Sequence, residues 1–506
     1  MSYGLRHVQL AACADYSRLH NAARTVSQAY PFGTPLFCRP RKICFSVEPR
    51  AASEAVHNQA TSRSLESAGS ATRRRPEPPR ETSFRSKGHA MKCSSWTISR
   101  LSLIVALIAA SASLARADVI MDWNAKADAI AAEKQILPAP HSRVLSMMHV
   151  AMFEAVNAID RRYAPYKLSL PADRSTSREA AAAVAAHDVL LSVYPDLKPD
   201  LDATLTNSLA PIADGESKIA GISLGKEAAM QIIELRANDG SAAPETYRPL
   251  TTPGAYVPTT VPLFSTTGAT TPWVMVSGSQ FRPGPPPALG SEVWTRDVNE
   301  IREVGSRSST TRTPEQTTIG RFWFFVGART YNPIVRQAAM AKGMDLIDCA
   351  RLFALTSIAG NDALVAVFDA KYHYNLWRPI TAIRNADLTS NPATPRDPSW
   401  LPLGETPMHP EYPCAHCITS AAISTVLQSV VGDFGEFSLT SSTAPGVTRK
   451  WSRLQDYSDE VSNARIWAGF HYRFSTEVGK DMGRKIGALT VATQLRGVEA
   501  MAEPKR

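Results

Sequence analysis

Cysteine is scarce in this sequence, which excludes a fold held together by many disulfides. The 506 residues include 7 cysteines, and only Cys349, Cys414 and Cys417 follow Ala117. Three cysteines cannot form a disulfide framework. The pair Cys414-x-x-Cys417 is interpreted as a redox pair or as half of a metal site. Because the sequence contains no second C-x-x-C, a zinc site is not expected.

Long apolar runs, strand patterns and repeats are also missing. No run of 18 apolar residues occurs, which argues against an integral protein with several membrane spans. Alternation of polar and apolar residues is rare, and no motif returns at a fixed period. The pattern therefore favours neither a sheet protein nor a repeat array.

The net charge of +9 is confined to the N-terminal end. Residues 1–90 carry 14 Lys or Arg and 6 Asp or Glu, and residues 91–117 carry three basic residues and no acid. The remainder holds 38 basic and 40 acidic residues and is almost neutral. A basic folded surface is therefore not indicated, and we expect no nucleic-acid partner.

The stretch 91–117 has the composition of a secretory signal peptide. Lys92 and Arg100 precede an apolar run over 101–115, and Ala115-Arg116-Ala117 fits an A-x-A cleavage site. The run of about 15 residues is short for a membrane span. A short membrane anchor is the alternative interpretation.

The position of this signal predicts where the natural protein begins. Export signals act at an N-terminus, so we expect production to start at Met91 and the mature protein to begin near Asp118. Residues 1–90, with many Ser, Arg and Pro, would then be a disordered upstream extension that was wrongly assigned to the protein. An organelle transit peptide is the alternative for them. We expect the mature protein to be exported, either periplasmic or secreted, with no stable membrane span after signal removal.

Apolar periodicity predicts an all-α protein built of helical bundles. The N-terminal helical region, 118–240, has helix patterns at 144–159, 177–195 and 216–236. His149 lies within the first of these patterns and is interpreted as a surface or boundary residue rather than a ligand.

A proline-rich segment divides two predicted helical regions. Ten prolines fall within 241–290, so 241–312 is predicted to be a long ordered loop or a linker. The C-terminal helical region, 313–506, begins with a capping box at Thr313-Pro-Glu-Gln316. Its other helix patterns cover 334–370, 417–430 and 456–495.

Three segments of the C-terminal region place basic residues among apolar ones. In the first, Lys371 and Arg378 are seven residues apart and would share one face of a helix. Two cations on one face without nearby acids repel each other unless an anion lies between them. A solvated basic face is the alternative, but Tyr372 and Trp377 are too apolar to favour it.

The second segment runs from His409 to Cys417. Pro413 before a run of small residues predicts a helix that begins near Cys414. The N–H groups and dipole of a helix N-terminus form an anion site, and His416 in the first turn would exchange a proton with a bound group.

The third segment contains Arg465 and His471. Arginine offers planar donors that suit oxyanions. A spacing of six does not place two residues on one helix face, so this pair would meet only across a bend or a helix end.

Together the three segments resemble the superfamily of type 2 phosphatidic-acid phosphatases, bacterial acid phosphatases and vanadium haloperoxidases. Its signature is K-x6-R-P, then P-S-G-H, then S-R-x5-H-x3-D. Residues 143–370 also look like the soluble bacterial haloperoxidase-like branch. The matching residues here are Lys371-x6-Arg378-Pro379, Pro413-Cys414-Ala415-His416 and Ala464-Arg465-x5-His471-x3-Ser475.

The resemblance implies a role for each matching residue. Lys371, Arg378 and Arg465 would neutralise the oxygens of vanadate or phosphate. The backbone N–H of Ala415 would donate to one oxygen, and His416 would be the acid–base group. His471 would be the axial vanadium ligand of a haloperoxidase or the nucleophile of a phosphatase, which forms a phosphohistidine.

This sequence departs from the signature in ways that bear on activity. Cys414 replaces the serine, and a thiol is a weaker donor to the anion. Ser475 replaces the aspartate, so we expect His471 to lack an orienting carboxylate, which would slow a phosphatase more than a haloperoxidase. Ala464 replaces a serine, a minor loss. His409 is either a second catalytic histidine, as in the algal bromoperoxidases, or a loop residue held by Pro410.

The resemblance implies a vanadate-dependent haloperoxidase-like enzyme that oxidises halide with hydrogen peroxide. A soluble exported acid phosphatase with no cofactor is the alternative, and a non-catalytic phosphate- or vanadate-binding relative is the third. The expected partners are small molecules: peroxide and halide, or a phosphate ester. The sequence indicates neither the halide, the organic substrate nor the oligomeric state.

Overall fold

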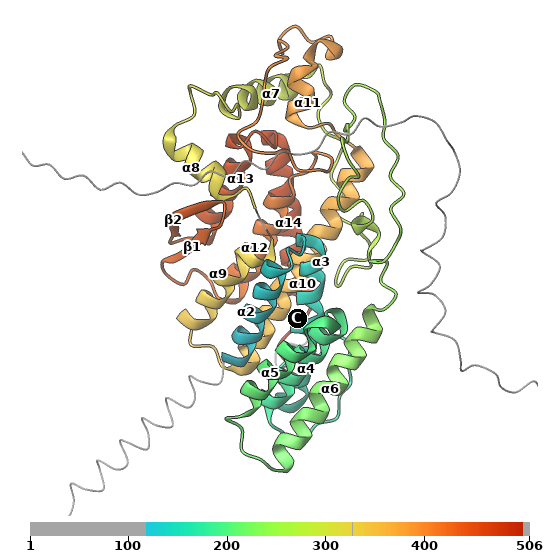
Figure 1. Ribbon diagram of the computed structural model, residues 1–506, viewed down its shortest axis with the longest axis vertical. Helices are drawn as coiled ribbons and strands as arrows, with labels where there is room; N and C mark the ends of the chain where they lie inside the picture. Colours follow the sequence, from blue (N-terminus) through green and yellow to red (C-terminus); the bar gives the residue numbers. More distant parts are fainter. Residues whose placement is uncertain (1–117, 326, 499–506) are drawn as a thin grey trace, which may run out of the picture. The chain divides into compact units, whose positions relative to one another are not determined.

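The computed structural model describes residues 118–325 and 327–498, which form a mainly helical body. Within these residues the regular elements are helices and one two-stranded hairpin (Figure 1). The prediction of an all-α fold is therefore confirmed. The predicted signal peptide (91–117) and upstream extension (1–90) lie outside the described residues.

The N-terminal helices pack closely because small residues line their contacts. An added Cβ at Gly221 or Gly225 would collide with the backbone oxygen of Ser177 or Ala181, so α6 lies directly against α4. Figure 1 shows these two helices side by side. The elements are α2 (Asp118–Glu133), α3 (Pro138–Asp160), α4 (Arg178–Val193), η1 (Pro195–Leu197), α5 (Lys198–Leu209) and α6 (Glu216–Arg236).

His149 lies in the core, so its interpretation as a surface or boundary residue was wrong. It is fully buried on α3. Its Nε2 lies 3.2 Å from Nδ2 of Asn124, and its Nδ1 lies 2.6 Å from Oγ of Ser357. Sequence periodicity could not show these partners, because they come from two other helices.

The proline-rich segment is an ordered loop that packs on α10 (Leu346–Tyr374). The carboxylate of Asp362 accepts the backbone N–H groups of Trp273, Val274 and Met275 at 2.7–3.0 Å. The prediction that 241–312 lacks regular structure was partly wrong. It contains η2 (Thr267–Ala269) and α7 (Glu292–Val304), whose N-cap is Ser291.

The C-terminal region contains more helices than the sequence pattern indicated. The capping box at Thr313 is confirmed at the start of α8. The hairpin pairs antiparallel strands. The elements are α8 (Pro314–Phe322), α9 (Ala328–Ala341), α10, α11 (Pro379–Arg384), η3 (Ala386–Thr389), α12 (Ala415–Val430), β1 (Phe437–Ser441), β2 (Ala444–Trp451), α13 (Leu454–Trp467) and α14 (Arg473–Thr493).

Two predicted continuous helices are each divided by a glycine. The pattern over 334–370 breaks at Gly343 (φ +56°), between α9 and α10. The pattern over 456–495 breaks at Gly469 (φ +81°), between α13 and α14. A positive φ ends a right-handed helix. The second break allows Arg465 and His471 to approach each other, as their spacing required.

Helix α10 is the central element of the body and ends at the candidate site. It packs on α3 and α12. Among the described residues it alone is long and apolar enough to cross a membrane by composition, and 94% of its most apolar window is buried inside the protein. It is therefore a core helix.

A close contact between α12 and α14 fixes the start of α12. An added Cβ at Gly479 would collide with the carbonyl oxygen of Cys414, and Gly483 makes the same approach to Ile418 one turn further on. The backbone N–H of Cys414 also donates to the carbonyl oxygen of Ser475, at 3.2 Å. The N-terminus of α12 is thereby held in one position.

Candidate oxyanion-binding active site

Lys371 contributes a buried cation from the last turn of α10. Its side chain is fully buried, and Nζ donates to the carbonyl oxygens of Pro410 (3.0 Å) and Glu411 (2.7 Å). Burial and the charge of Arg378 lower the pKa of Lys371 well below its usual value, against the opposing charge of Glu411.

Arg378 is the second buried cation, but it does not share a helix with Lys371. Helix α10 ends at Tyr374, and Arg378 is the N-cap of α11, so the predicted common helix face was wrong. The chain between α10 and α11 nevertheless brings the guanidinium of Arg378 to the site that Lys371 occupies. Nε donates to the carbonyl oxygen of His409 at 2.8 Å. Burial lowers the pKa of Arg378 to about 10.

Arg465 is the third cation and has the fewest partners. Nη1 donates to the carbonyl oxygen of Trp323, and the guanidinium carbon lies 4.7 Å from the centre of the Phe470 ring. Nε and Nη2 are buried and have no hydrogen-bond partner among the described residues. Burial, followed by the charge of Arg378, lowers the pKa of Arg465 to about 9. These two donors are free to bind a ligand.

His471 is oriented by Glu411, a residue that the sequence analysis missed. Nδ1 of His471 lies 2.8 Å from Oε1 of Glu411, which also accepts the backbone N–H of Tyr472 at 3.0 Å. The expectation that His471 lacks a carboxylate was therefore wrong. Ser475 is buried, and its hydroxyl faces Glu411, where it helps to lower the pKa of that carboxyl. Although Ser475 replaces the aspartate of the signature, Glu411 from another segment orients His471.

This contact determines which nitrogen of His471 is unprotonated. Ionised Glu411 accepts a hydrogen bond from Nδ1–H, so Nε2 keeps its lone pair. That lone pair accepts from Nη1 of Arg378 at 3.3 Å. Burial and the charges of Arg378, Lys371 and Arg465 lower the pKa of His471 well below 6.5. Burial raises the pKa of Glu411 to about 7, while Lys371 and Arg378 oppose this rise.

The N-terminus of α12 supplies the remaining groups, as predicted. The helix begins at Ala415 with Cys414 as its N-cap. The N–H of Ala415 is in the first turn, where N–H groups have no partner within a helix. Nε2 of His416 is buried without a partner among the described residues, and burial and Arg465 lower the pKa of His416 well below its usual value.

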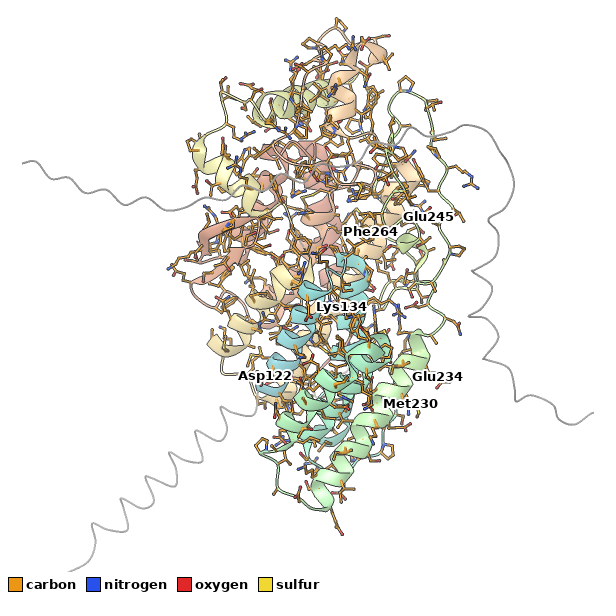
Figure 2. All side chains as sticks on the ribbon, viewed as in Figure 1. Asp122, Lys134, Met230, Glu234, Glu245 and Phe264 are labelled. Atoms are coloured by element: carbon orange, nitrogen blue, oxygen red, sulfur yellow. A yellow bond between two sulfur atoms is a disulfide. The ribbon has the colours of Figure 1, made fainter. Side chains whose placement is uncertain are left out.

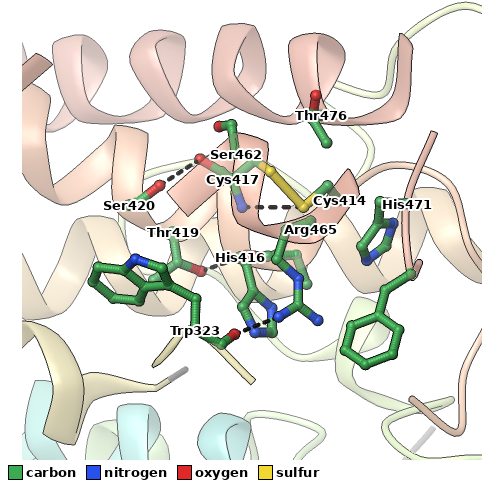
Figure 3. Close-up of a disulfide and its surroundings, with 12 residues drawn as sticks. Trp323, Cys414, His416, Cys417, Thr419, Ser420, Ser462, Arg465, His471 and Thr476 are labelled. Atoms are coloured by element: carbon green, nitrogen blue, oxygen red, sulfur yellow. Dashed lines mark hydrogen bonds between the residues drawn. A yellow bond between two sulfur atoms is a disulfide. The ribbon is translucent and has the colours of Figure 1, made fainter. Parts of the chain in front are cut away.

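The side chain of Cys414 cannot serve as the predicted anion donor in this structure. Cys414 and Cys417 form a disulfide, so Sγ carries no proton (Figure 3). Sγ of Cys414 instead accepts a hydrogen bond from the backbone N–H of Cys417, at 3.3 Å. The two sulfurs are therefore paired with each other rather than free to bind a metal, and a redox role for the pair stays a prediction.

His409 lies beside the cations rather than on an exposed loop. Its Nδ1 is 3.0 Å from Nη2 of Arg378 and 3.1 Å from the carbonyl oxygen of Pro410. Its ring packs against Phe368 and Phe264, at centroid distances of 5.2 and 6.4 Å. Burial and Arg378 lower the pKa of His409 well below its usual value. His409 therefore belongs to the site, and its ring also contacts Pro410, so the two interpretations of this residue do not exclude each other.

A cavity of about 80 Å³ adjoins the start of α12 and is lined by His409, Ala415 and His416. Phe264 enters the lining from the proline-rich segment, where Figure 2 labels it. A cavity that holds a benzene ring is on the order of 150 Å³, so this one suits small reactants. Its larger apolar residues are Leu145, Phe264, Val335, Leu364, Phe368 and Ile423.

We define the oxyanion site as the groups just described: Lys371, Arg378, His409, Glu411, Ala415, His416, Arg465 and His471. The site holds three buried basic side chains and one carboxylate, and buried charge of one sign is costly unless it is compensated. A bound oxyanion would supply the missing charge and accept hydrogen bonds from Arg465 and from the helix N-terminus. Neutral His471 would turn its unprotonated Nε2 from Arg378 to the central atom, as a nucleophile or ligand.

Comparisons with known proteins agree with this geometry. The family model of the second helical-bundle domain of vanadium chloroperoxidase matches residues 351–499, which include every basic residue of the oxyanion site. Vanadium chloroperoxidase of Curvularia inaequalis is 26% identical in an alignment of 372 positions, which covers 56% of this chain. The match spans 60% of that relative's length.

Solved structures share the fold. A bacterial vanadium-dependent iodoperoxidase matches with a TM-score of 0.66 at 25% identity, covering 76% of this chain and 98% of that one. A bacterial vanadium-dependent chloroperoxidase in its holo form matches with a TM-score of 0.56 at 17% identity, covering 70% and 92%. The structure therefore shares the helical fold of the vanadium haloperoxidases, and residues 351–499 match the family model of their second helical-bundle domain.

Proposed function

We propose that this protein is a vanadate-dependent haloperoxidase-like enzyme that oxidises a halide with hydrogen peroxide. The observation that carries the proposal is the pair of unpartnered donors on Arg465, in the same site as a neutral His471 whose Nε2 is unprotonated and contacts only Arg378 among the described residues. Vanadate fits these residues, because it needs charge-assisted donors for its oxygens and one nitrogen for its metal. The family relationship supports the same class of activity.

The residues of the oxyanion site divide the work of binding and proton transfer. Bound vanadate would supply a Lewis-acidic centre that activates peroxide toward halide. Lys371, Arg378 and Arg465 would hold its oxygens and balance their charge. His471 would supply Nε2 as the protein ligand, and Glu411 fixes the His471 tautomer through Nδ1.

His416 is the group placed to move a proton. It lies in the first turn of α12 and lines the cavity, with Nε2 unpartnered among the described residues. A neutral imidazole there accepts a proton from an incoming small acid such as peroxide and returns it later. The apolar lining of the cavity limits the water that would compete at Nε2.

Halide oxidation after vanadate loading tests the proposal. Purified protein with vanadate, peroxide and iodide or bromide should form oxidised halogen, and omission of vanadate should abolish it. His471→Ala should lose the activity while retaining its helical content by circular dichroism. A correctly folded protein that binds vanadate and oxidises no halide would overturn the proposal.

An acid phosphatase is the second candidate, and one observation favours it. The contact of His471 with Glu411 supplies the orienting carboxylate that a nucleophilic histidine needs. The cavity of about 80 Å³ favours only small esters. Release of phosphate from a small ester, with a phosphohistidine trapped at His471, would support this candidate. Phosphate binding without either reaction would indicate the non-catalytic alternative.

We also propose that the protein is exported. The disulfide between Cys414 and Cys417 supports this location, because disulfides persist in oxidising compartments. N-terminal sequencing of native protein should find a start near Asp118, and a start within 1–90 would contradict the proposal.

A further inference from the structure

The disulfide between Cys414 and Cys417 has no role in the function proposed above. It joins the N-cap of α12 to the third residue of the helix, and both cysteines are fully buried. The N-terminus of this helix belongs to the oxyanion site. A change at these two sulfurs therefore occurs where the anion binds.

The packing around the disulfide leaves the sulfurs little room to move away. The backbone of Cys414 is bonded to Ser475, and Gly479 lies against both cysteines. Figure 3 shows Arg465, His416 and His471 among the residues that surround the disulfide. A free sulfur at position 414 would remain next to the oxyanion site.

The charge of that sulfur differs between the two oxidation states. In the disulfide, Sγ of Cys414 is neutral. As a free cysteine at a helix N-terminus, with Arg465 beside it (Figure 3), it is stabilised as a thiolate. A thiolate would compensate part of the positive charge of the site, so an oxyanion would gain less by binding.

We propose that Cys414 and Cys417 form a reversible oxidation site that controls the oxyanion site. The disulfide form binds the anion, and the dithiol form binds it weakly. Hydrogen peroxide is the oxidant that converts the dithiol form to the disulfide form. That peroxide is a substrate rests on the proposed haloperoxidase function. The effect of the two oxidation states on anion binding does not rest on it.

The oxidation balances with one peroxide for each disulfide. The thiolate of Cys414 attacks one peroxide oxygen, the O–O bond breaks, and hydroxide leaves and takes up a proton to become water. The sulfenic acid on Cys414 is then attacked by the sulfur of Cys417. The S–S bond forms, and the S–OH oxygen leaves with a proton as a second water. The two sulfurs lose two electrons, and peroxide gains them.

Binding of inorganic phosphate to the full chain tests this proposal. Phosphate is a suitable probe because reductants do not consume it. Calorimetry should show that reduced protein binds phosphate at least about tenfold more weakly than oxidised protein, with two additional thiols by thiol titration. One equivalent of peroxide should restore both values.

Variants separate the sulfur charge from other effects of the reductant. Cys417→Ser leaves the Cys414 thiol without its partner and should bind phosphate weakly without any reductant. Cys414→Ser should show the same affinity with and without reductant. Cys349→Ser, outside the disulfide, should respond to reductant as the unmodified protein does.

The outcomes distinguish this proposal from the proposed function. Equal phosphate affinity in the oxidised protein, the reduced protein and Cys417→Ser would overturn the redox proposal and leave the oxyanion site intact. Failure of both the oxidised and the reduced protein to bind phosphate or vanadate would overturn the site itself, and the redox proposal with it.

Discussion

Two buried polar clusters in this molecule differ in how completely their groups are paired. In the first, here named the Asp128 cluster, Asp128 accepts from His141 (3.1 Å), Asn332 (2.8 Å) and Arg336 (3.0 Å). One carboxylate meets one guanidinium, so the charges balance. The cluster lies between α2, α3, α9 and α10 and comprises Asn124, Asp128, His141, His149, Asn332, Arg336 and Ser357.

The oxyanion site is unbalanced by comparison. Lys371 and Arg378 share the single carboxylate of Glu411, and donor atoms of Arg465 remain unpartnered among the described residues. Buried polar groups are paired in the great majority of proteins, so an unpaired set with one sign of charge points to a ligand. Burial of polar residues alone therefore does not identify a ligand-binding site, whereas unpaired donors and uncompensated charge do.

The largest expected effect comes from exchanging one arginine in each cluster for alanine. Arg465→Ala should weaken vanadate or phosphate binding by about 2–4 kcal/mol, because a charge-assisted donor pair is lost. Arg336→Ala should leave that affinity unchanged and lower the free energy of unfolding by roughly 1–3 kcal/mol, because Asp128 loses a partner. Calorimetry and urea unfolding of both variants measure the two effects. Equal anion affinity in the two variants would remove the distinction between the clusters.

The Asp128 cluster should make stability depend on pH through His149. Burial lowers the pKa of His149 to about 3, whereas it is near 6.5 in the unfolded chain. The unfolded state therefore binds the proton more readily between these values, and stability falls as the pH falls below 6.5. We expect a loss of about 2 kcal/mol down to pH 5. Urea unfolding of His149→Gln should show a shallower slope; an unchanged slope would assign the loss elsewhere.

Within the oxyanion site, Glu411 should set the tautomer of His471 with a midpoint close to pH 7. The pKa of Glu411 is raised to about 7, so its proton is lost above that pH and Oε1 then accepts from Nδ1. Below it, the protonated carboxyl donates to Nδ1, and the imidazole proton moves to Nε2. Nitrogen NMR of the His471 ring should follow this exchange in the unliganded protein. In Glu411→Gln the tautomer should not change with pH.

The smallest effect is expected at Ser475. Because Glu411 already orients His471, Ser475→Asp should not accelerate hydrolysis of phosphate esters. The new carboxylate would be fully buried and should lower the melting temperature. Faster hydrolysis in this variant would show that Glu411 does not perform the orienting role.

Sequence reasoning found the basic half of the oxyanion site and missed its acidic half. Lys371, Arg378 and Arg465 were predictable because cations among aromatic and apolar residues are conspicuous. Glu411 and His471 meet only through the fold, since sixty residues separate them. The one available signal was a carboxylate placed two residues after His409, between Pro410 and Pro413.

The helices and strands were likewise predictable only where the signal lies within the element itself. Capping and periodicity predicted where α6, α8 and α12 begin, because these signals lie within each helix. The helix α7 was missed because the surrounding prolines obscured it. The hairpin of β1 and β2 was missed because its strands are short and alternate weakly. The course of the chain from α10 to α11 depends on tertiary contacts that no local pattern records.

The unpartnered donors of Arg465 and the unprotonated Nε2 of His471 are proposed to form one oxyanion site. A crystal structure of the protein soaked with vanadate tests it most directly, because vanadium can be located by its anomalous scattering. We predict one vanadium peak at bonding distance from Nε2 of His471, with a vanadate oxygen accepting from Nη2 of Arg465. A peak at another position, or a soaked crystal without one, would contradict the claim.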